Sequence, residues 1–196
     1  TIDLDGEKIS AKNLWAQWGD AARVSGEVQI DRWQDPKNWQ IELSHSELFA
    51  RSDFANRFLR LAPDASAWVN RIGYAQVRGK GSMNAQRASW DGTLRTQLGT
   101  LQVLGAVAYG GKQEPVYQAA ISGQLDGLMV LFPGSDIKSA RLQTEIKGVG
   151  IKKLSALGEI RNLSTATYQY EPIRFSLEGS DPKWEVQLYA QDPNLS

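Results

Sequence analysis

The sequence contains no cysteine and a single histidine, His45, among its 196 residues. The lack of cysteine excludes a disulfide framework and any chemistry that needs a thiol. No phosphate-binding loop, GxSxG motif or HExxH pair is present, so the common nucleotide-binding, hydrolase and zinc-protease signatures are missing. We therefore predict that the chain is not an enzyme and that it binds no cofactor or metal. His45 lies where its predicted strand ends, and we predict a structural role for it.

Four acidic residues are the remaining candidates for catalysis or metal binding, namely Glu47, Asp53, Asp91 and Asp126. They are scattered at predicted turns and helix starts, where helix capping and turn formation explain them. A glycosidase-like carboxylate pair among them stays open as an alternative.

The sequence also has no excess charge, because 22 basic side chains balance 22 acidic ones. A neutral chain has no overall field that attracts nucleic acid, so we predict no nucleic-acid partner. It has neither a signal peptide nor an apolar run long enough for a membrane-spanning helix. Because it starts at Thr1 and ends at Ser196, we expect it to be a segment of a longer protein, whose anchor would lie elsewhere.

Alternating apolar and polar residues predict about ten strands, for example over residues 72–90, 101–109 and 183–190. Asp35-Pro36-Lys37-Asn38 predicts a hairpin turn, and Asp91-Gly92 predicts another. Helical spacing predicts only three short helices, over residues 10–19, 53–61 and 126–132. So few helices leave a sandwich, a barrel or an open curled sheet as the possible architectures.

A long internal repeat relates residues 61–81 to residues 131–150. In both copies an apolar run is followed by proline (Pro63, Pro133) and then by a strand that ends in Gly-x-Gly. The repeat predicts one domain, 1–196, built from units 1–62, 63–132 and 133–196. It also predicts that residues 53–61 and 126–132 are equivalent short helices, each leading into a strand.

A shorter pattern runs along the predicted strands, in which a central glycine is flanked at i−2 and i+2 by apolar or small residues. Glycine weakens a strand, so its repetition predicts bending. At Gly79, Gly81, Gly148 and Gly150 we predict bent or bulged backbone rather than a nucleotide-binding loop. The central glycines of the six copies are Gly26, Gly79, Gly105, Gly123, Gly148 and Gly158.

These glycine pentads, together with the proline-ended apolar runs, resemble the strand repeats of the AsmA-like group of cell-envelope proteins, which includes TamB. The resemblance covers residues 24–160, and the N component of type II secretion systems has a similar glycine pattern. It implies an antiparallel sheet curled into an open, taco-like groove in the periplasm, in a protein anchored in the inner membrane. It also implies phospholipid acyl chains as cargo moving toward the outer membrane, and an outer-membrane insertase such as TamA as a partner in outer-membrane protein assembly.

Two other functions remain open. One is a structural or partner-docking β scaffold. The other is a carbohydrate-binding β-sandwich, because seven tryptophans could stack on sugar rings, although Trp39, Trp90 and Trp184 lie at predicted strand ends. A sugar binder would gather several tryptophans on one exposed face, whereas a lipid conduit would line one face with aliphatic residues and leave tryptophan at the rims.

Period-two alternation selects sixteen apolar residues that we expect to line one continuous surface, the predicted lipid groove. They are Val28, Ile30, Ile41, Leu43, Val77, Leu94, Val103, Val107, Ile121, Leu142, Ile146, Ile160, Phe175, Leu177, Val186 and Leu188.

Overall fold

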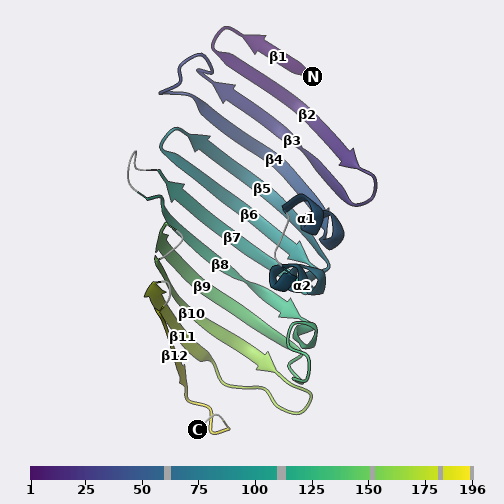
Figure 1. The fold of residues 1–196 in the computed structure, drawn as a ribbon, viewed down its shortest axis with the longest axis vertical. Helices are drawn as coiled ribbons and strands as arrows, with labels where there is room; N and C mark the ends of the chain where they lie inside the picture. The colour runs from purple at the N-terminus through teal and green to yellow at the C-terminus, as the bar shows by residue number, and fades with distance from the viewer. Residues whose placement is uncertain (60–62, 110–113, 151–152, 181–182, 195–196) are drawn as a thin grey trace. The chain divides into compact units, whose positions relative to one another are not determined.

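The computed structural model describes residues 1–59, 63–109, 114–150, 153–180 and 183–194, and within them the chain is mainly β (Figure 1). The described residues form twelve strands, two α-helices and one short 3-10 helix. They divide into two compact units, Thr1–Gln97 and Leu98–Ser196. We describe each unit by itself.

The first unit is an antiparallel sheet in which each strand pairs with the next one along the chain. Two helices interrupt the sequence of strands between the fourth and the fifth. The elements are β1 (Ile2–Asp5), β2 (Lys8–Trp18), β3 (Ala22–Asp31), β4 (Gln40–Arg51), α1 (Ser52–Leu59), α2 (Pro63–Ile72), β5 (Tyr74–Asn84) and β6 (Arg87–Thr96).

The second unit is also an antiparallel sheet with sequential pairing. Its only described helix is a single 3-10 turn. The elements are β7 (Gly99–Ala108), β8 (Val116–Asp126), η1 (Leu128–Val130), β9 (Ser139–Val149), β10 (Lys153–Ser164), β11 (Ile173–Ser180) and β12 (Lys183–Ala190).

Neither sheet closes on itself. Among the described residues no pairing joins β1 to β6 or β7 to β12, and within each unit all the strands belong to one sheet. Of the three architectures that the sequence allows, the structure therefore shows an open antiparallel sheet in each unit.

The hairpin turn predicted at Asp35-Pro36-Lys37-Asn38 is confirmed, since it connects β3 to β4. One carboxylate oxygen of Asp35 accepts a hydrogen bond from the Lys37 backbone N–H at 3.0 Å, and the other accepts one from Asn38 Nδ2 at 2.7 Å. These bonds lower the pKa of Asp35, with the Asn38 side chain as the largest cause. The turn thus forms through the local bonding that its residue types favour.

The hairpin predicted at Asp91-Gly92 is wrong, because both residues lie inside β6. The chain turns earlier, between Asn84 and Arg87. There the Asn84 side-chain oxygen accepts hydrogen bonds from the backbone N–H groups of Gln86 and Arg87, at 2.9 and 2.8 Å. An asparagine that bonds to the backbone two and three residues ahead makes a turn without glycine.

The helix predicted over residues 10–19 is also wrong, because this segment is β2. A bulge at Asn13, whose φ is 55°, places one extra residue in β2 between Ala11 and Leu14. The bulge breaks the period-two pattern. Ala11, Leu14 and Trp18 consequently share one face of a strand although their spacing is that of a helix.

The predicted equivalence of residues 53–61 and 126–132 is wrong. The first segment begins in α1, with residues 60 and 61 outside the described ranges, whereas the second contains only the three residues of η1. Pro63 begins helix α2, where its missing N–H costs nothing, while Pro133 lies in a turn. The structure thus does not show two copies of a 70-residue unit.

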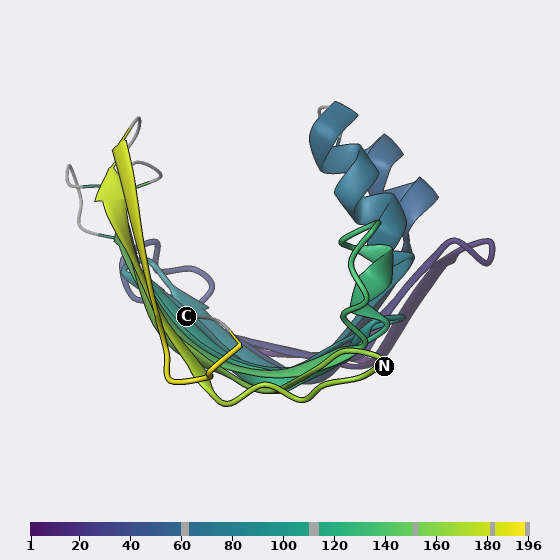
Figure 2. The ribbon, with the colours of Figure 1, turned by 90° about the horizontal axis from the view of Figure 1, so that it is seen from below.

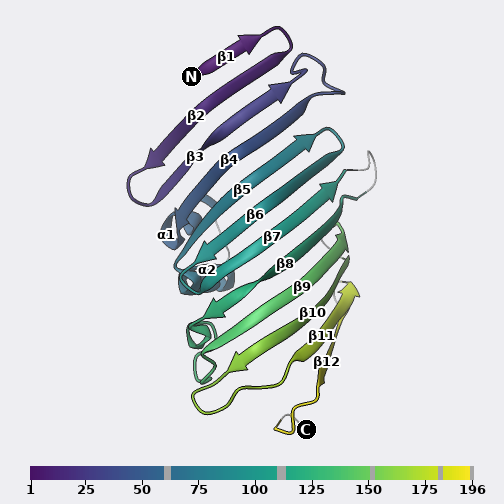
Figure 3. The ribbon, with the colours of Figure 1, turned by 180° about the vertical axis from the view of Figure 1, so that it is seen from behind.

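Both helices of the first unit stand at the end of β4 and the start of β5, on the concave side of the bowed strands (Figure 2). Viewed from behind, the opposite face of this sheet is not covered by any described helix (Figure 3). The aromatic rings of Phe54 in α1 and Trp18 in β2 lie 6.0 Å apart, and the Phe58 ring stacks on Phe54 at 5.8 Å. Trp18 therefore points to the concave side.

Candidate functional site: the apolar face

In the first unit, strand register places the predicted groove residues on one face. Ile30 lies opposite Ile41, Val28 opposite Leu43, and Val77 opposite Leu94. Directly opposed residues in an antiparallel pair point to the same side. Since Trp18 belongs to this face through its pairing with Ala22, the face is the concave one. The structure brings together Val28, Ile30, Ile41, Leu43, Val77 and Leu94.

In the second unit the other ten predicted residues likewise share one face. Cross-strand rows run from Val103 through Ile121 and on to Phe175 and Leu188, with matching rows beside it. The structure brings together Val103, Val107, Ile121, Leu142, Ile146, Ile160, Phe175, Leu177, Val186 and Leu188.

Several residues that the prediction omitted lie on the same faces. In the first unit Leu14, Val24 and Leu48 belong to the apolar face, and Leu48 was missed because a bulge shifts its parity relative to Leu43. In the second unit Leu101 and Leu154 belong to it, and plain alternation within their strands was the signal that could have found them.

Both apolar faces are largely open to solvent. The buried apolar residues of the described chain are few and mostly small: Ala11, Ala22, Leu98, Leu128, Ala140 and Ala156. No large side chain there is fully buried. Fourteen of the sixteen predicted residues are half-buried by their neighbours in the sheet, whereas Val186 and Leu188 on β12 are 59% and 68% exposed. The faces therefore lack the second layer that normally covers an apolar sheet.

Strand glycines on these faces lie beneath aromatic rings. In the first unit the Trp90 indole covers Gly79, Gly81 and Gly92, and a Cβ at Gly81 would lie 3.0 Å from the ring. Trp90 was predicted at a strand end, but it lies within β6, so that prediction is wrong. The large ring fills the space that the missing side chains leave, which keeps the face smooth and apolar.

The second unit repeats this arrangement with other rings. The Tyr117 ring lies over Gly148, the Phe175 ring over Gly158 and the Trp184 ring over Gly179. The pairs are direct cross-strand neighbours, with Tyr117 opposite Gly148 and Phe175 opposite Gly158. Of the six pentad glycines, Gly79, Gly148 and Gly158 thus lie under a ring of a neighbouring strand, whereas no ring is among the atoms nearest to Gly26, Gly105 and Gly123.

The predicted bending at glycine holds at only part of the predicted positions. Gly150 has a φ of 59° and turns the chain after β9. Gly79 and Gly81 pair with β4 on either side of a bulge, but the extra residue belongs to β4. Gly148 sits in a regular register with both neighbours, so the prediction is wrong there.

The bulge in β4 centres on His45, whose φ is 50°. His45 was predicted to lie where its strand ends, which is wrong, because β4 continues to Arg51. Its imidazole is 87% exposed, with Nδ1 3.7 Å from the Glu27 carboxylate. The backbone of His45 therefore adds one extra residue to β4, and this lets Leu43 and Leu48 lie on the same face.

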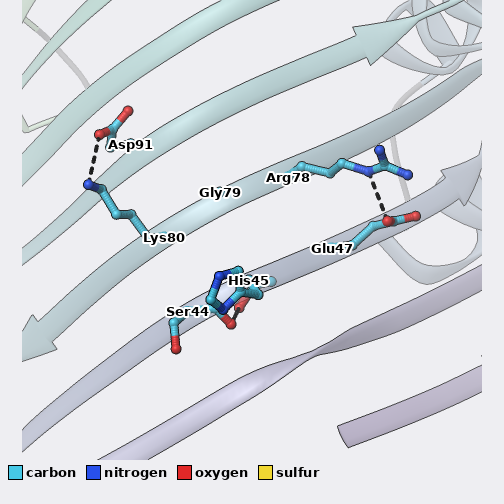
Figure 4. Close-up of a pocket in the computed structure, with 8 residues that line it drawn as sticks. Ser44, His45, Glu47, Arg78, Gly79, Lys80 and Asp91 are labelled. Atoms are coloured by element: carbon cyan, nitrogen blue, oxygen red, sulfur yellow. Dashed lines mark hydrogen bonds and ion pairs between the residues drawn. The ribbon is translucent and has the colours of Figure 1, made fainter. Parts of the chain in front are cut away.

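An open depression of about 520 Å³ lies beside this bulge (Figure 4). It is lined by His45, Lys80 and Asp91 among others, and the Lys80 ammonium lies 3.5 Å from the Asp91 carboxylate. The charges are paired across neighbouring strands and exposed to water. The depression thus lacks the enclosed, convergent polar groups of a catalytic pocket.

The face opposite the apolar one is polar, and Glu47 is its most connected residue. Its carboxylate accepts hydrogen bonds from Gln76 at 2.8 Å and from Arg23 and Arg78, each at 2.8 Å. The hydrogen bond from Gln76 is the largest cause that lowers the pKa of Glu47, and the two arginines lower it further. Partial burial acts in the opposite direction but does not outweigh them. The Arg23 guanidinium also lies over the Phe49 ring, 5.3 Å from its centre.

The remaining acidic candidates have local partners. Asp53 lies 3.5 Å from Arg51, and Asp126 accepts a hydrogen bond from the Gln124 side chain at 3.2 Å. In the described ranges no three His, Asp or Glu side chains gather in a way that suits a metal ion. Within the first unit Glu47 and Asp91 line the same open depression, whereas Asp53 does not, and Asp126 belongs to the second unit.

The tryptophans do not gather on one face either. Trp18, Trp90 and Trp184 lie on apolar faces, whereas Trp15 lies on the polar face of β2 opposite Ser25. The others lie at Trp33 and Trp39, which flank the turn between β3 and β4, and at Trp68 in α2. Trp18 and Trp184 are close to strand ends, at the rim of the apolar faces.

No family model, curated protein or solved structure matches this chain. Neither α1 nor α2, nor any other helix among the described residues, is long and apolar enough to cross a membrane.

Proposed function

We propose that the apolar face binds the acyl chains of phospholipids, in a periplasmic segment of a cell-envelope protein that is anchored in the inner membrane. The observation that carries the proposal is that each open sheet exposes one apolar face. In each unit the face is made of aliphatic cross-strand rows and glycines under aromatic rings. The opposite face carries the ion pairs of the strands in both units, and in the second unit it also exposes Leu104 and Leu157.

Such a face suits acyl chains because it offers apolar area without polar recognition groups. Each methylene that leaves water for this surface contributes about 0.8 kcal/mol at full burial. Contact with an open face buries only part of each methylene, so several carbons must lie on the sheet together. The smooth strips over Gly148 and Gly158 are apolar and lack charged side chains that an acyl chain would have to desolvate.

Within this proposal the sheet is a taco-like groove in which lipid moves toward the outer membrane, as in the AsmA-like proteins that the sequence resembles. An outer-membrane insertase such as TamA is then the expected partner. The scattered tryptophans weigh against the alternative of a sugar platform, because Trp15 and Trp90 lie on opposite faces.

Two charged substitutions in the second unit test lipid binding, Val103→Arg and Leu142→Arg. Both residues are half-buried on the apolar face, and the open sheet lets an arginine head reach water, so the variants should fold. We expect them to lose lipid retained after purification, measured by mass spectrometry, and to crosslink less to a photoactivatable phospholipid. Matched controls are Gln102→Arg and Gln143→Arg, which are the next residues of the same strands on the polar face.

The controls make the result decisive. If the apolar-face variants and the polar-face variants retain equal amounts of lipid, the acyl-chain proposal is wrong. If Val103→Arg and Leu142→Arg unfold by circular dichroism while their controls fold, the face is covered in solution, and the open groove is wrong.

A further inference from the structure

The turn between β8 and β9 in the second unit carries an exposed apolar stretch. Residues 128–132 read Leu-Met-Val-Leu-Phe, and no charged residue lies between positions 127 and 135. The 3-10 helix η1 occupies the first part of this stretch. The side chains of Met129, Val130 and Phe132 are exposed, at 49%, 46% and 48%. Consecutive apolar residues on a surface mark a site that contacts another apolar phase or molecule.

The base of this turn is packed against the end of the sheet. Leu128 is buried, and its backbone N–H donates to the Lys138 carbonyl oxygen at 3.3 Å. Ala140, which lies opposite Leu125 at the end of the apolar face, is buried as well. From this base the turn, drawn in green, rises to the concave side of its strands (Figure 2). The turn is therefore an apolar projection with a fixed base, at one end of the apolar face.

The backbone of the turn pairs its polar groups internally. The N–H of Val130 donates to the Gly127 carbonyl oxygen at 3.0 Å. The N–H groups of Leu131 and Phe132 donate to the Leu128 carbonyl oxygen at 3.0 and 3.1 Å. The next residue is a proline, which has no N–H. Backbone that enters lipid must pair its polar groups within the chain, and the turn meets this condition at these positions.

The charges at the base of the turn balance. Asp126 and Asp136 flank the turn, and Lys138 and Arg141 follow in the sequence. Such a base neither attracts nor repels an anionic surface strongly, so apolar contact must supply the binding. An ordinary protein interface also carries about ten hydrogen bonds. The turn has no polar side chain from residue 128 to residue 133, so it suits a bilayer better than a protein partner.

We propose that the turn of residues 127–135 inserts its apolar side chains into the surface of a phospholipid bilayer. Apolar groups that bind in this way lie at the boundary between the headgroups and the acyl chains. The contact places one end of the apolar face next to the bilayer. The turn is separate from the acyl-chain site on that face, and its insertion does not depend on that site.

The absence of cysteine allows a direct test, since a cysteine introduced at Met129 is the only thiol in the chain. A nitrobenzoxadiazole label on Met129→Cys should shift its emission to the blue when phosphatidylcholine vesicles are added. Lipids that carry a nitroxide on the acyl chain should quench it. The matched control is Thr167→Cys, which is exposed in the turn between β10 and β11. This turn lies at the same end of the sheet, because Ser164 is opposite Ser139, and its label should stay in water.

Vesicle co-sedimentation of the unlabelled chain is the second measurement. Met129→Glu puts a charge on the tip and should lower the partition coefficient into phosphatidylcholine vesicles by at least about tenfold. Thr167→Glu adds the same charge to the neighbouring turn and should leave the coefficient unchanged. Both positions are exposed, so both variants should fold, which circular dichroism checks. Replacement of some phosphatidylcholine by anionic phosphatidylglycerol should change the coefficient by less than about threefold.

Several results would overturn this insertion. One is a label at residue 129 that neither shifts nor is quenched, and another is equal vesicle binding by Met129→Glu and Thr167→Glu. A blue shift that grows with protein concentration in the absence of vesicles would mean that a second copy covers the turn. Binding that requires phosphatidylglycerol would mean that charge holds the chain on the vesicle. Val103→Arg should bind vesicles as the wild type does. If it loses binding while Met129→Glu keeps it, the apolar face and not the turn contacts the bilayer.

Discussion

The two units are built on the same plan but differ in how regular their strands are. In the second unit β7, β8 and β9 pair in an unbroken register, and a single bulge at Asn162 appears near the end of β10. In the first unit Asn13 and His45 insert extra residues in the middle of β2 and β4, and two helices follow β4. Alternation of apolar and polar residues therefore predicts which face a side chain lies on over long stretches of the second unit, but only between bulges in the first.

The difference shows what a bulge does for an apolar face. Without the bulge in β4, Leu43 and Leu48 would point to opposite sides, because they are five positions apart. With it, the strand keeps one apolar side and also places Glu47 among arginines on the other. The bulges of the first unit thus let an irregular sequence produce the same two-sided sheet that simple alternation produces in the second.

Replacement of His45 by valine should have the largest effect on this comparison. A β-branched residue strongly disfavours the φ of 50° that the bulge needs. If residue 45 became extended, Leu48 would move to the polar face and Glu47 to the apolar one. We expect the first unit to lose about 3 kcal/mol of its free energy of unfolding, measured by urea unfolding followed by circular dichroism. Deletion of His45 is the control, because it removes the extra residue and leaves Leu43 and Leu48 four positions apart on the same face.

The expected pattern is selective. His45→Val should split unfolding into an early transition for the first unit and a later one for the second. If His45→Val melts like the wild type, the bulge does not set the faces of β4.

Replacement of a strand glycine by valine should have the second-largest effect, and the size of this effect should differ between the two units. At Gly92 in the first unit, a Cβ would overlap the carbonyl oxygen of Arg78 and meet Trp90 Nε1 at 2.9 Å. At Gly105 in the second unit, the nearest atom to a Cβ is the Gln118 carbonyl oxygen at 3.6 Å. We expect Gly92→Val to cost about 2 kcal/mol or more through overpacking, and Gly105→Val to be close to neutral.

Thermal melts of the two glycine variants test this difference. Equal destabilisation would mean that the strand glycines serve a common backbone conformation. A loss confined to Gly92→Val would show that the Trp90 ring and the opposing strand determine which glycine is needed.

Much of the fold follows from the sequence wherever alternation is unbroken. The prediction for residues 183–190 matches β12, and the turn at Asp35 forms as its residue types require. The sequence did not reveal the helix that starts at Pro63, because proline was interpreted as a stop rather than as a first helical residue. Asparagine and histidine adopt positive φ more readily than most residues, but the alternation pattern does not show that Asn13 and His45, among them, would form bulges.

The candidate site was predictable to a similar extent. Sixteen residues chosen by alternation fall on one face of their own unit, because cross-strand register preserves parity. The role of Trp90 was not predictable. The Trp90 ring covers glycines of β5 because the pairing of β5 with β6 brings these residues together. A single sequence does not specify which residues of two strands are opposed.

The smallest effect concerns the Glu47 cluster of the first unit and its dependence on pH. The pKa of Glu47 is lowered from its ordinary value of 4.5, with the Gln76 hydrogen bond as the largest cause. A carboxyl whose folded-state pKa is depressed stabilises the fold above its unfolded-state pKa, and this stability is lost as the pH falls through the folded-state pKa. Glu47→Gln should therefore cost about 1 kcal/mol or less at pH 7, because both arginine partners of this partly buried carboxylate are open to solvent, and nothing at a pH below the folded-state pKa.

Melting curves of the wild type and Glu47→Gln between pH 7 and pH 3 measure this difference directly. Gln76→Ala is the sharper variant, because it keeps the carboxylate and both arginines but removes the largest cause of the shift. In an NMR titration it should return the pKa of Glu47 toward 4.5. If the Glu47 pKa stays lowered in Gln76→Ala, the arginines alone hold the carboxylate. If the two melting curves stay equally far apart at every pH, the cluster stabilises the sheet through packing and not through charge.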